Sequence, residues 1–145
     1  MAITSAICTS FKQELLVGTH NFTATSGDTF KIALFTSSAS LGAGTTAYST
    51  SNEITNSSGT AYTAGGATLT SVTPTTSGTT AICDFADVSY TSASFTANGA
   101  LIYNSSQSNK AVAVIAFGGD KTVSSGTFTI QFPAKAATTA IVRIA

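Results

Sequence analysis

Short runs in which apolar and polar residues alternate constrain this chain more than any other feature. In residues 29–36, Phe30, Ile32 and Leu34 fall on one face, and Lys31 falls on the other. A period of two residues places successive side chains on opposite faces of an extended backbone, which is the pattern of a β-strand. The run therefore predicts a strand with one buried face.

Similar runs recur along the rest of the chain. The run KAVAVIAF at 110–117 is apolar on both faces, which is typical of a central strand. Turns separate the runs by ~8–12 residues, a spacing that favours an all-β fold of the antiparallel β-sandwich or jelly-roll-like class. We expect further strands at 67–72 (closed by Pro74), 80–90, 95–103, 128–132 and 141–145.

Three of these runs contain residues that interrupt a regular strand. Asp84 and Asp87 suggest a bulge or kink within 80–90. Gly99 follows an Asn, and this pair signals either a hairpin turn or a bulge within one strand. The alternation of side chains continues on the same face before and after Gly99, which favours one continuous strand. The pair Gly118-Gly119 predicts a turn after the central strand.

One segment near the N-terminus has helical signals. Ser10 is a plausible N-cap, Gly18 is a suitable stop, and Phe11 and Leu15 share one face of the intervening helix. A helix of about two turns does not persist alone. We therefore expect it to dock on another surface.

The length of 145 residues fits a single β domain over residues 1–145. Within it we expect an N-terminal arm with the short helix at 1–27 and the β-sandwich at 28–145. Residues 37–66 are rich in Ser, Thr, Gly and Asn. We interpret them as a long surface excursion with one short strand near 61–62, because this stretch is too long for a plain turn.

Charged residues make up 8% of the chain, against about 25% in an average soluble protein. The formal net charge is zero, which disfavours nucleic acid and anionic membranes as partners. No apolar run approaches the ~20 residues of a membrane helix. Hydroxyl groups supply most of the polar surface, and such a surface is favoured where a protein is packed against other proteins.

Residues that could carry out catalysis are few. His20 is the single histidine, and a loop histidine without a chemical role is the favoured interpretation. Asp84 and Asp87 could hold a cation or act as acid and base, but turn capping is favoured. Two cysteines, one histidine and scattered acids do not form a metal site. The sequence predicts no enzyme activity, no metal and no cofactor.

The start of the chain has no basic segment followed by an apolar core, so it does not indicate a signal peptide. We therefore expect synthesis in a cytoplasm, where thiols stay reduced. Cys83 lies in an apolar run and is interpreted as a small core residue, and Cys8 receives the same interpretation.

Four segments resemble small virion proteins of tailed double-stranded DNA phages, notably those that infect cyanobacteria and marine bacteria. The resemblance extends over nearly the whole chain. It rests on structural motifs and carries over no catalytic residue. The segments are SGDTFKIALFTSSA (26–39), AYTAGGATLTSVTP (61–74), GALIYN (99–104) and KAVAVIAFGGDKTVSSGTFTIQFP (110–133).

The resemblance implies a component of the virion: a capsid cement or decoration protein that binds the major capsid protein, commonly as a homotrimer. Two alternatives stay open, a tail component (tube, adaptor or fibre-base protein) and a carbohydrate-binding β-sandwich that uses tyrosines. The helix and the 37–66 excursion have no evident core role, and the terminal strand carries few charges. The candidate contact residues are Phe11, Leu15, Tyr48, Tyr62, Ile141 and Arg143.

Overall fold

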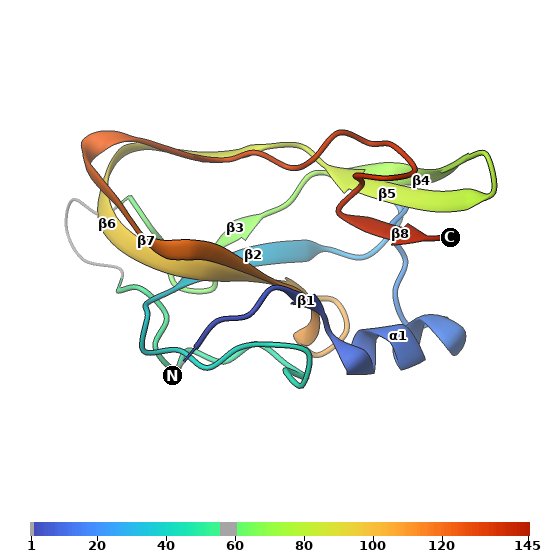
Figure 1. Cartoon of the computed structure of the whole chain (residues 1–145), viewed down its shortest axis with the longest axis horizontal. Coiled ribbons are helices and arrows are strands. Elements are labelled where there is room, and N and C mark those ends of the chain that lie inside the picture. The colour runs from blue at the N-terminus through green and yellow to red at the C-terminus, as the bar shows by residue number, and fades with distance from the viewer. Residues whose placement is uncertain (1, 56–60) are drawn as a thin grey trace.

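The computed structural model describes residues 2–55 and 61–145, which form two antiparallel sheets and one short helix (Figure 1). One sheet has the strand order β1-β7-β6-β2-β3 and the other has the order β4-β5-β8. The predicted all-β, sandwich-like fold class with a short N-terminal helix is confirmed. The elements are β1 (Ala6–Ile7), α1 (Thr9–Leu16), β2 (Phe30–Phe35), β3 (Ala67–Thr68), β4 (Ser71–Ser77), β5 (Thr80–Phe85), β6 (Val88–Asn104), β7 (Lys110–Ile130) and β8 (Val142–Ile144).

The helix α1 begins slightly earlier than the sequence signals indicate. Cys8 occupies the N-cap position in place of Ser10 and makes no side-chain capping bond. Gly18 follows the helix with a φ of +75°, as a C-terminal stop requires. Phe11 is fully buried and packs its ring edge-on against Phe22, with centroids 5.8 Å apart. No helix in the described residues is long and apolar enough to cross a membrane.

The strand β2 is buried on both of its faces. Phe30, Ile32 and Leu34 are fully buried as predicted, but Ala33 and Phe35 on the other face are buried as well. The one-sided strand expected from Lys31 is therefore a central strand, paired with β6 on one side and with β3 on the other. The core of the molecule lies along it.

The strands β6 and β7 form a long hairpin that belongs to both layers. Figure 1 shows the two strands running along the lower layer, bending together, and returning above it toward β4 and β5. Ala97 pairs with Lys121 and Gly99 pairs with Ala116, so more residues lie between the two partners on β7 than between the two on β6. The bend is thus a bulge in which β7 carries additional residues.

Glycines permit this bend. A Cβ atom on Gly99 would lie 2.7 Å from the carbonyl oxygen of Ile115, so no larger residue fits. Gly118 and Gly119 have φ values of +76° and +141°. The continuous strand through Gly99 is confirmed, whereas the predicted turn at Gly118-Gly119 is wrong. The positive φ values help to bend β7, which stays paired with β6 on both sides of these glycines and does not end there.

The predicted strand at 80–90 is divided between the two sheets. β5 ends at Phe85 and β6 begins at Val88. The predicted irregularity is located here, and Asp87 stabilises it by accepting a hydrogen bond from the backbone N–H of Phe132 at 2.8 Å. The expected stop at Pro74 is wrong: β4 continues through Pro74, because a bulge between Val72 and Thr75 accommodates it.

Candidate functional site

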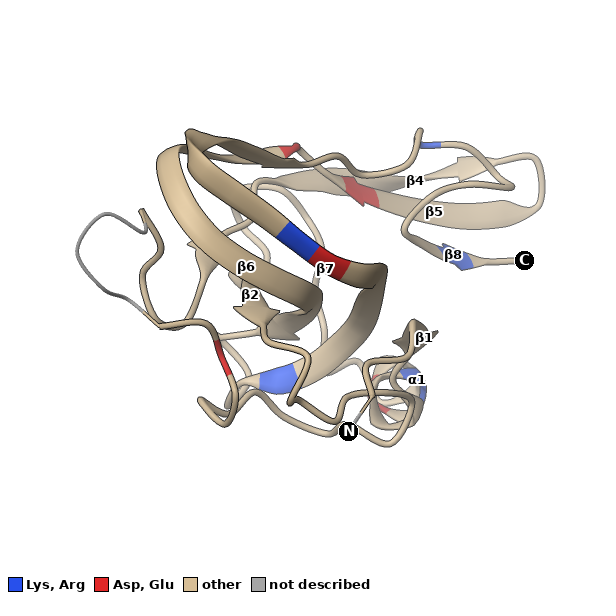
Figure 2. Ribbon diagram, turned by 60° about the vertical axis from the view of Figure 1, so that its left-hand side comes forward, with Lys and Arg blue, Asp and Glu red and all other residues tan. Residues whose placement is uncertain are grey.

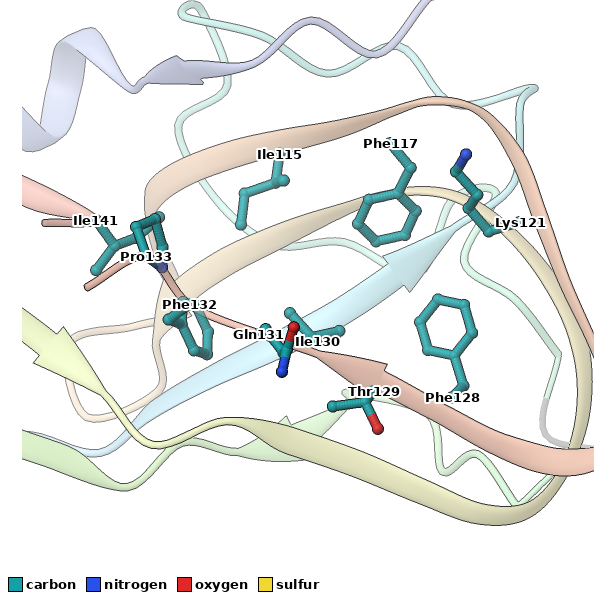
Figure 3. A pocket seen from close by; sticks show the side chains of 10 residues that line it. All are labelled: Ile115, Phe117, Lys121, Phe128, Thr129, Ile130, Gln131, Phe132, Pro133 and Ile141. Carbon is teal, nitrogen blue, oxygen red and sulfur yellow. The ribbon is translucent and has the colours of Figure 1, made fainter. Parts of the chain in front are cut away.

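An open apolar groove lies between the two arms of the bent strand β7. Its volume is about 520 Å³, and Figure 3 shows its side chains converging from both arms. We call it the β7 groove. It is lined by Ile115, Phe117, Lys121, Phe128, Thr129, Ile130, Gln131, Phe132, Pro133 and Ile141.

The aromatic rings of the groove are held by neighbouring rings. Phe128 lies 4.9 Å from the ring of Phe95 and 6.1 Å from the ring of Phe117, and all three side chains are half-buried. Phe132 packs against Phe85 at 5.7 Å. Each of these groove rings contacts another ring of the protein, which favours a preformed groove.

The outer edge of β7 beside this groove is free in the described part of the chain. β1 covers β7 only at Ala113 and Val114, and the hydroxyl of Ser5 accepts a hydrogen bond from Ala116 N–H at 2.8 Å. Beyond Ala116 the strand pairs with β6 alone. Backbone groups on this edge are therefore available to another chain.

Three large apolar side chains are exposed in the described residues. Leu16 and Val17, at the C-terminal end of α1, are 89% and 70% exposed, and Ile144 on β8 is 57% exposed. Leu15 and Ile144 line a common small pocket, so the helix end lies next to β8. Adjacent exposed Leu and Val side chains are typical of a contact surface.

The strand β4 forms a sheet edge without any charged residue. Its sequence is SVTPTTS, and the five residues from Thr73 to Ser77 are exposed in succession. A strand with one buried face would alternate between buried and exposed. Both faces of this part of β4 are therefore open to solvent, as is its outer edge apart from contacts at Thr73.

His20 belongs to a buried polar network that fastens the helix to the sheet. Its side chain is fully buried, with Nε2 3.0 Å from Glu14 Oε1 and Nδ1 3.0 Å from Asn104 Nδ2. An amide NH₂ can only donate, so Nδ1 accepts and Nε2 carries the proton. Lys110 adds an ion pair to Glu14 at 3.3 Å. Both ring nitrogens are engaged, so the imidazole has no free nitrogen for base catalysis.

Asp28 completes this network. Its carboxylate accepts hydrogen bonds from the Asn104 amide at 2.8 Å and from the Asn21 backbone N–H at 3.0 Å. Partial burial favours the neutral acid, but these bonds and one from Gln107 outweigh it and lower the pKa of Asp28. The ionised carboxylate is therefore the form that holds the network together.

All four tyrosines of the sequence gather around Glu53. The hydroxyls of Tyr48 and Tyr62 donate to its carboxylate at 2.7 and 2.6 Å. Tyr103 stacks on Tyr48 with centroids 4.4 Å apart, and Tyr90 lies 5.8 Å from Tyr62. The rings are turned into the protein, so they do not form the exposed stacking platform that a carbohydrate-binding sandwich requires.

The raised pKa values of the clustered tyrosines support a structural role for them. Burial, reinforced by hydrogen bonds to Glu53, raises the pKa values of Tyr48 and Tyr62. Burial raises the pKa of Tyr90 to about 12. These hydroxyls stay protonated near neutral pH. Tyr48 and Tyr62 therefore remain donors to Glu53, and these bonds hold parts of the 37–66 excursion to one another. The Tyr62 hydroxyl also accepts a hydrogen bond from the Leu34 N–H of β2 at 2.9 Å, which ties the excursion to the sheet.

The two cysteines are free and buried. Burial is the main cause that raises the pKa of Cys8 to about 11 and that of Cys83 to about 12. Because the thiolate is the reactive form, neither thiol is activated for chemistry. Within residues 2–55 and 61–145, no group of three or more His, Cys, Asp or Glu side chains is placed to hold a metal ion.

The candidate contact residues are distributed over different parts of the fold. Phe11 and Tyr62 are core residues, 0% and 1% exposed, so their side chains are not surface contacts. This corrects the expectation that the helix and the excursion lack a core role. Tyr48 is half-buried in the tyrosine cluster, and Leu15 lines the small pocket beside β8.

The last two candidates lie near the C-terminus. Ile141 lines the β7 groove, and Arg143 is exposed on β8, which is an edge strand. No strand forms at 61–62, where Ala61 has a φ of +59°, outside the extended region that a strand requires. Sequence reasoning did not identify the β7 groove, although the alternation of Phe128, Ile130 and Phe132 marked one of its walls.

The comparisons with known proteins give no assignment. No protein-family model, curated protein or solved structure gives a significant match to the chain.

Proposed function

We propose that this chain is a structural protein of a tailed-phage particle, a capsid cement or decoration protein that binds the lattice of the major capsid protein. In this proposal it acts as a homotrimer, is located in the virion, and has no catalytic role. The observation that carries the proposal is the uncharged, exposed edge strand β4.

An exposed edge strand is a liability for a protein that stays free in solution, because it can pair with other strands. Proteins usually protect such an edge with charges, but β4 has none, and Pro74 is its single blocking residue. The edge is therefore suited to pairing with, or packing against, a fixed partner. A capsid lattice offers the same partner surface many times.

The rest of the surface supports the same proposal. Figure 2 shows only scattered charged residues on an otherwise uncharged ribbon. Hydroxyl groups lose less free energy than ions when they are removed from water, provided that they find hydrogen-bond partners. A surface of this kind can be covered extensively by neighbouring proteins at a modest desolvation cost.

The test is binding of the purified chain to expanded phage heads that lack it. Thr75→Lys places a charge on the exposed part of β4, and we expect it to weaken head binding by about tenfold or more, which corresponds to ~1.4 kcal/mol. Thr127→Lys is the matched control, since Thr127 is an exposed threonine on β7, and its binding should be unchanged.

Electron microscopy of labelled chain on whole particles gives the second measurement. Label on heads supports the proposal. Label on tails would replace it with the tail-component alternative, and binding to neither part would end both. Equal head binding by the Thr75→Lys and Thr127→Lys variants would show that β4 does not form the contact.

A further inference from the structure

The chain carries a convex apolar feature and a concave one at separate places. The convex feature is the end of α1, where Leu16 and Val17 are 89% and 70% exposed; we call it the helix-end knob. The concave feature is the β7 groove. The two share no residue, and α1 lies next to β8, whereas the groove follows the bend of β7 (Figures 1 and 3).

The groove is large enough for the knob. A dry protein cavity of about 150 Å³ accommodates one benzene-sized group. The β7 groove has about 520 Å³, which is room for a pair of aliphatic side chains and the backbone between them. Its lining includes the rings of Phe117, Phe128 and Phe132, whose apolar faces suit Leu and Val methyl groups.

The charges at the two features are complementary. Among the residues that the structure describes, Lys121 is the one charged residue that lines the groove. The C-terminal end of a helix carries a partial negative charge on its last carbonyl groups. At the end of α1 the carbonyls of Glu14 and Leu15 already accept hydrogen bonds from Thr19 N–H and Gly18 N–H, so the remaining negative potential comes from the carbonyls that follow them. The last turn of α1 contains no basic residue to neutralise it, and Leu16 and Val17 lie at this end. A knob placed in the groove would bring the carbonyl groups toward the Lys121 ammonium group.

We propose that the helix-end knob of one copy of this chain occupies the β7 groove of a second copy. The contact joins two different surfaces and is therefore heterologous, so successive copies assemble head to tail and close into a ring when the rotation permits. This inference deepens the homotrimer of the proposed function by naming its interface. It concerns the purified chain alone, so it can hold even if the protein binds no capsid.

Sedimentation equilibrium on the purified full chain is the first test. We expect the wild type to form a closed oligomer and the double variant L16S/V17S to be monomeric at the same concentrations. Folding should be unaffected, because both side chains are exposed. Ile144→Ser is the matched control: Ile144 is also an exposed aliphatic residue, and its substitution should leave the oligomer intact.

A second variant changes the charge of the groove by substituting exposed residues only. Lys121 and Thr129 are both exposed and line the groove. The double variant K121E/T129E places two carboxylates where the helix carbonyls would lie. We expect it to weaken association by at least about tenfold, which in free energy is about 1.4 kcal/mol.

Mixing the two variants distinguishes the proposed contact from any other. The knob variant keeps an intact groove, and the groove variant keeps an intact knob, so an equimolar mixture should form 1:1 dimers and no rings. A monomeric wild type, an oligomer that survives L16S/V17S, or a mixture that stays monomeric would each overturn the inference. Loss of the oligomer in Ile144→Ser with retention in L16S/V17S would assign the contact to β8 instead.

Discussion

The strands β2 and β4 have similar lengths, but β2 is buried in the core and most of β4 is exposed to solvent. All but one residue of β2 are buried, whereas the residues of β4 from Thr73 onward are all exposed. β2 contains one charged residue and β4 contains none, so charge does not decide which strand is buried. The size of the apolar side chains decides it, and the strand left outside is the one made of hydroxyl groups.

This contrast divides the molecule into a part that stabilises the fold and a part that offers exposed surface for contacts. The first part contains β2, the adjoining length of β6, and the polar networks centred on His20 and Glu53. The second contains β4, the helix-end knob and the β7 groove. Substitutions in the two parts should therefore affect different measurements.

The largest effect is expected in the aromatic core. Phe30 is fully buried, stacks on Phe22 with centroids 4.3 Å apart, and lies 5.8 Å from Phe85. Phe30→Ala should lower the free energy of unfolding by about 3–5 kcal/mol, because it removes these contacts and leaves a cavity. Urea denaturation measures the loss.

The matched substitution in the other part is Val72→Ala on β4, where Val72 is half-buried. It should cost less than about 1 kcal/mol. Similar losses of unfolding free energy for Phe30→Ala and Val72→Ala would contradict the division of the molecule into these two parts.

The next effect concerns Glu53. Its carboxylate accepts hydrogen bonds from Tyr48, from Tyr62 and from the backbone N–H of Gly65 at 2.8 Å. Glu53→Ala deprives these buried donors of their acceptor, and we expect a loss of at least about 2 kcal/mol in unfolding free energy. Glu53→Gln keeps one carbonyl acceptor and should lose roughly half as much or less. Equal losses for the two variants would mean that packing, and not hydrogen bonding, holds the excursion.

The smallest effect is a pH dependence. The pKa of Asp28 is lowered in the folded state from its usual 3.8. Its contribution to stability is therefore complete above that value and is lost as the pH falls through the folded pKa. Asp28→Asn should flatten the acid limb of a plot of stability against pH, measured by thermal unfolding between pH 2 and 6. An unchanged acid limb would show that other carboxyls control it.

The sequence predicts the elements better than their connections. Alternation located β2, the central strand at 110–117 and the strand through Gly99. It could not distinguish a turn from a bend at Gly118 and Gly119, because positive φ values serve both purposes. Only the pairing of β7 with β6 on both sides of these glycines decides between them.

The candidate contact surfaces were harder to predict for a related reason. The walls of the β7 groove are far apart in the sequence and meet only because the strand bends. At the helix, the sequence pattern indicates the shared face of Phe11 and Leu15, and in the structure that face turns inward. The informative signal was the adjacent pair Leu16 and Val17, two apolar residues outside that face.

The continuous passage of β6 and β7 through both layers has a mechanical consequence. In a sandwich whose layers are joined only by loops, one sheet can slide over the other while the ladders stay intact. Here a sliding motion would have to deform the bend, where Gly99 leaves no space against the Ile115 carbonyl. A force applied to the sheet of β4, β5 and β8 is therefore transmitted through the paired strands β6 and β7 into the sheet that contains β2.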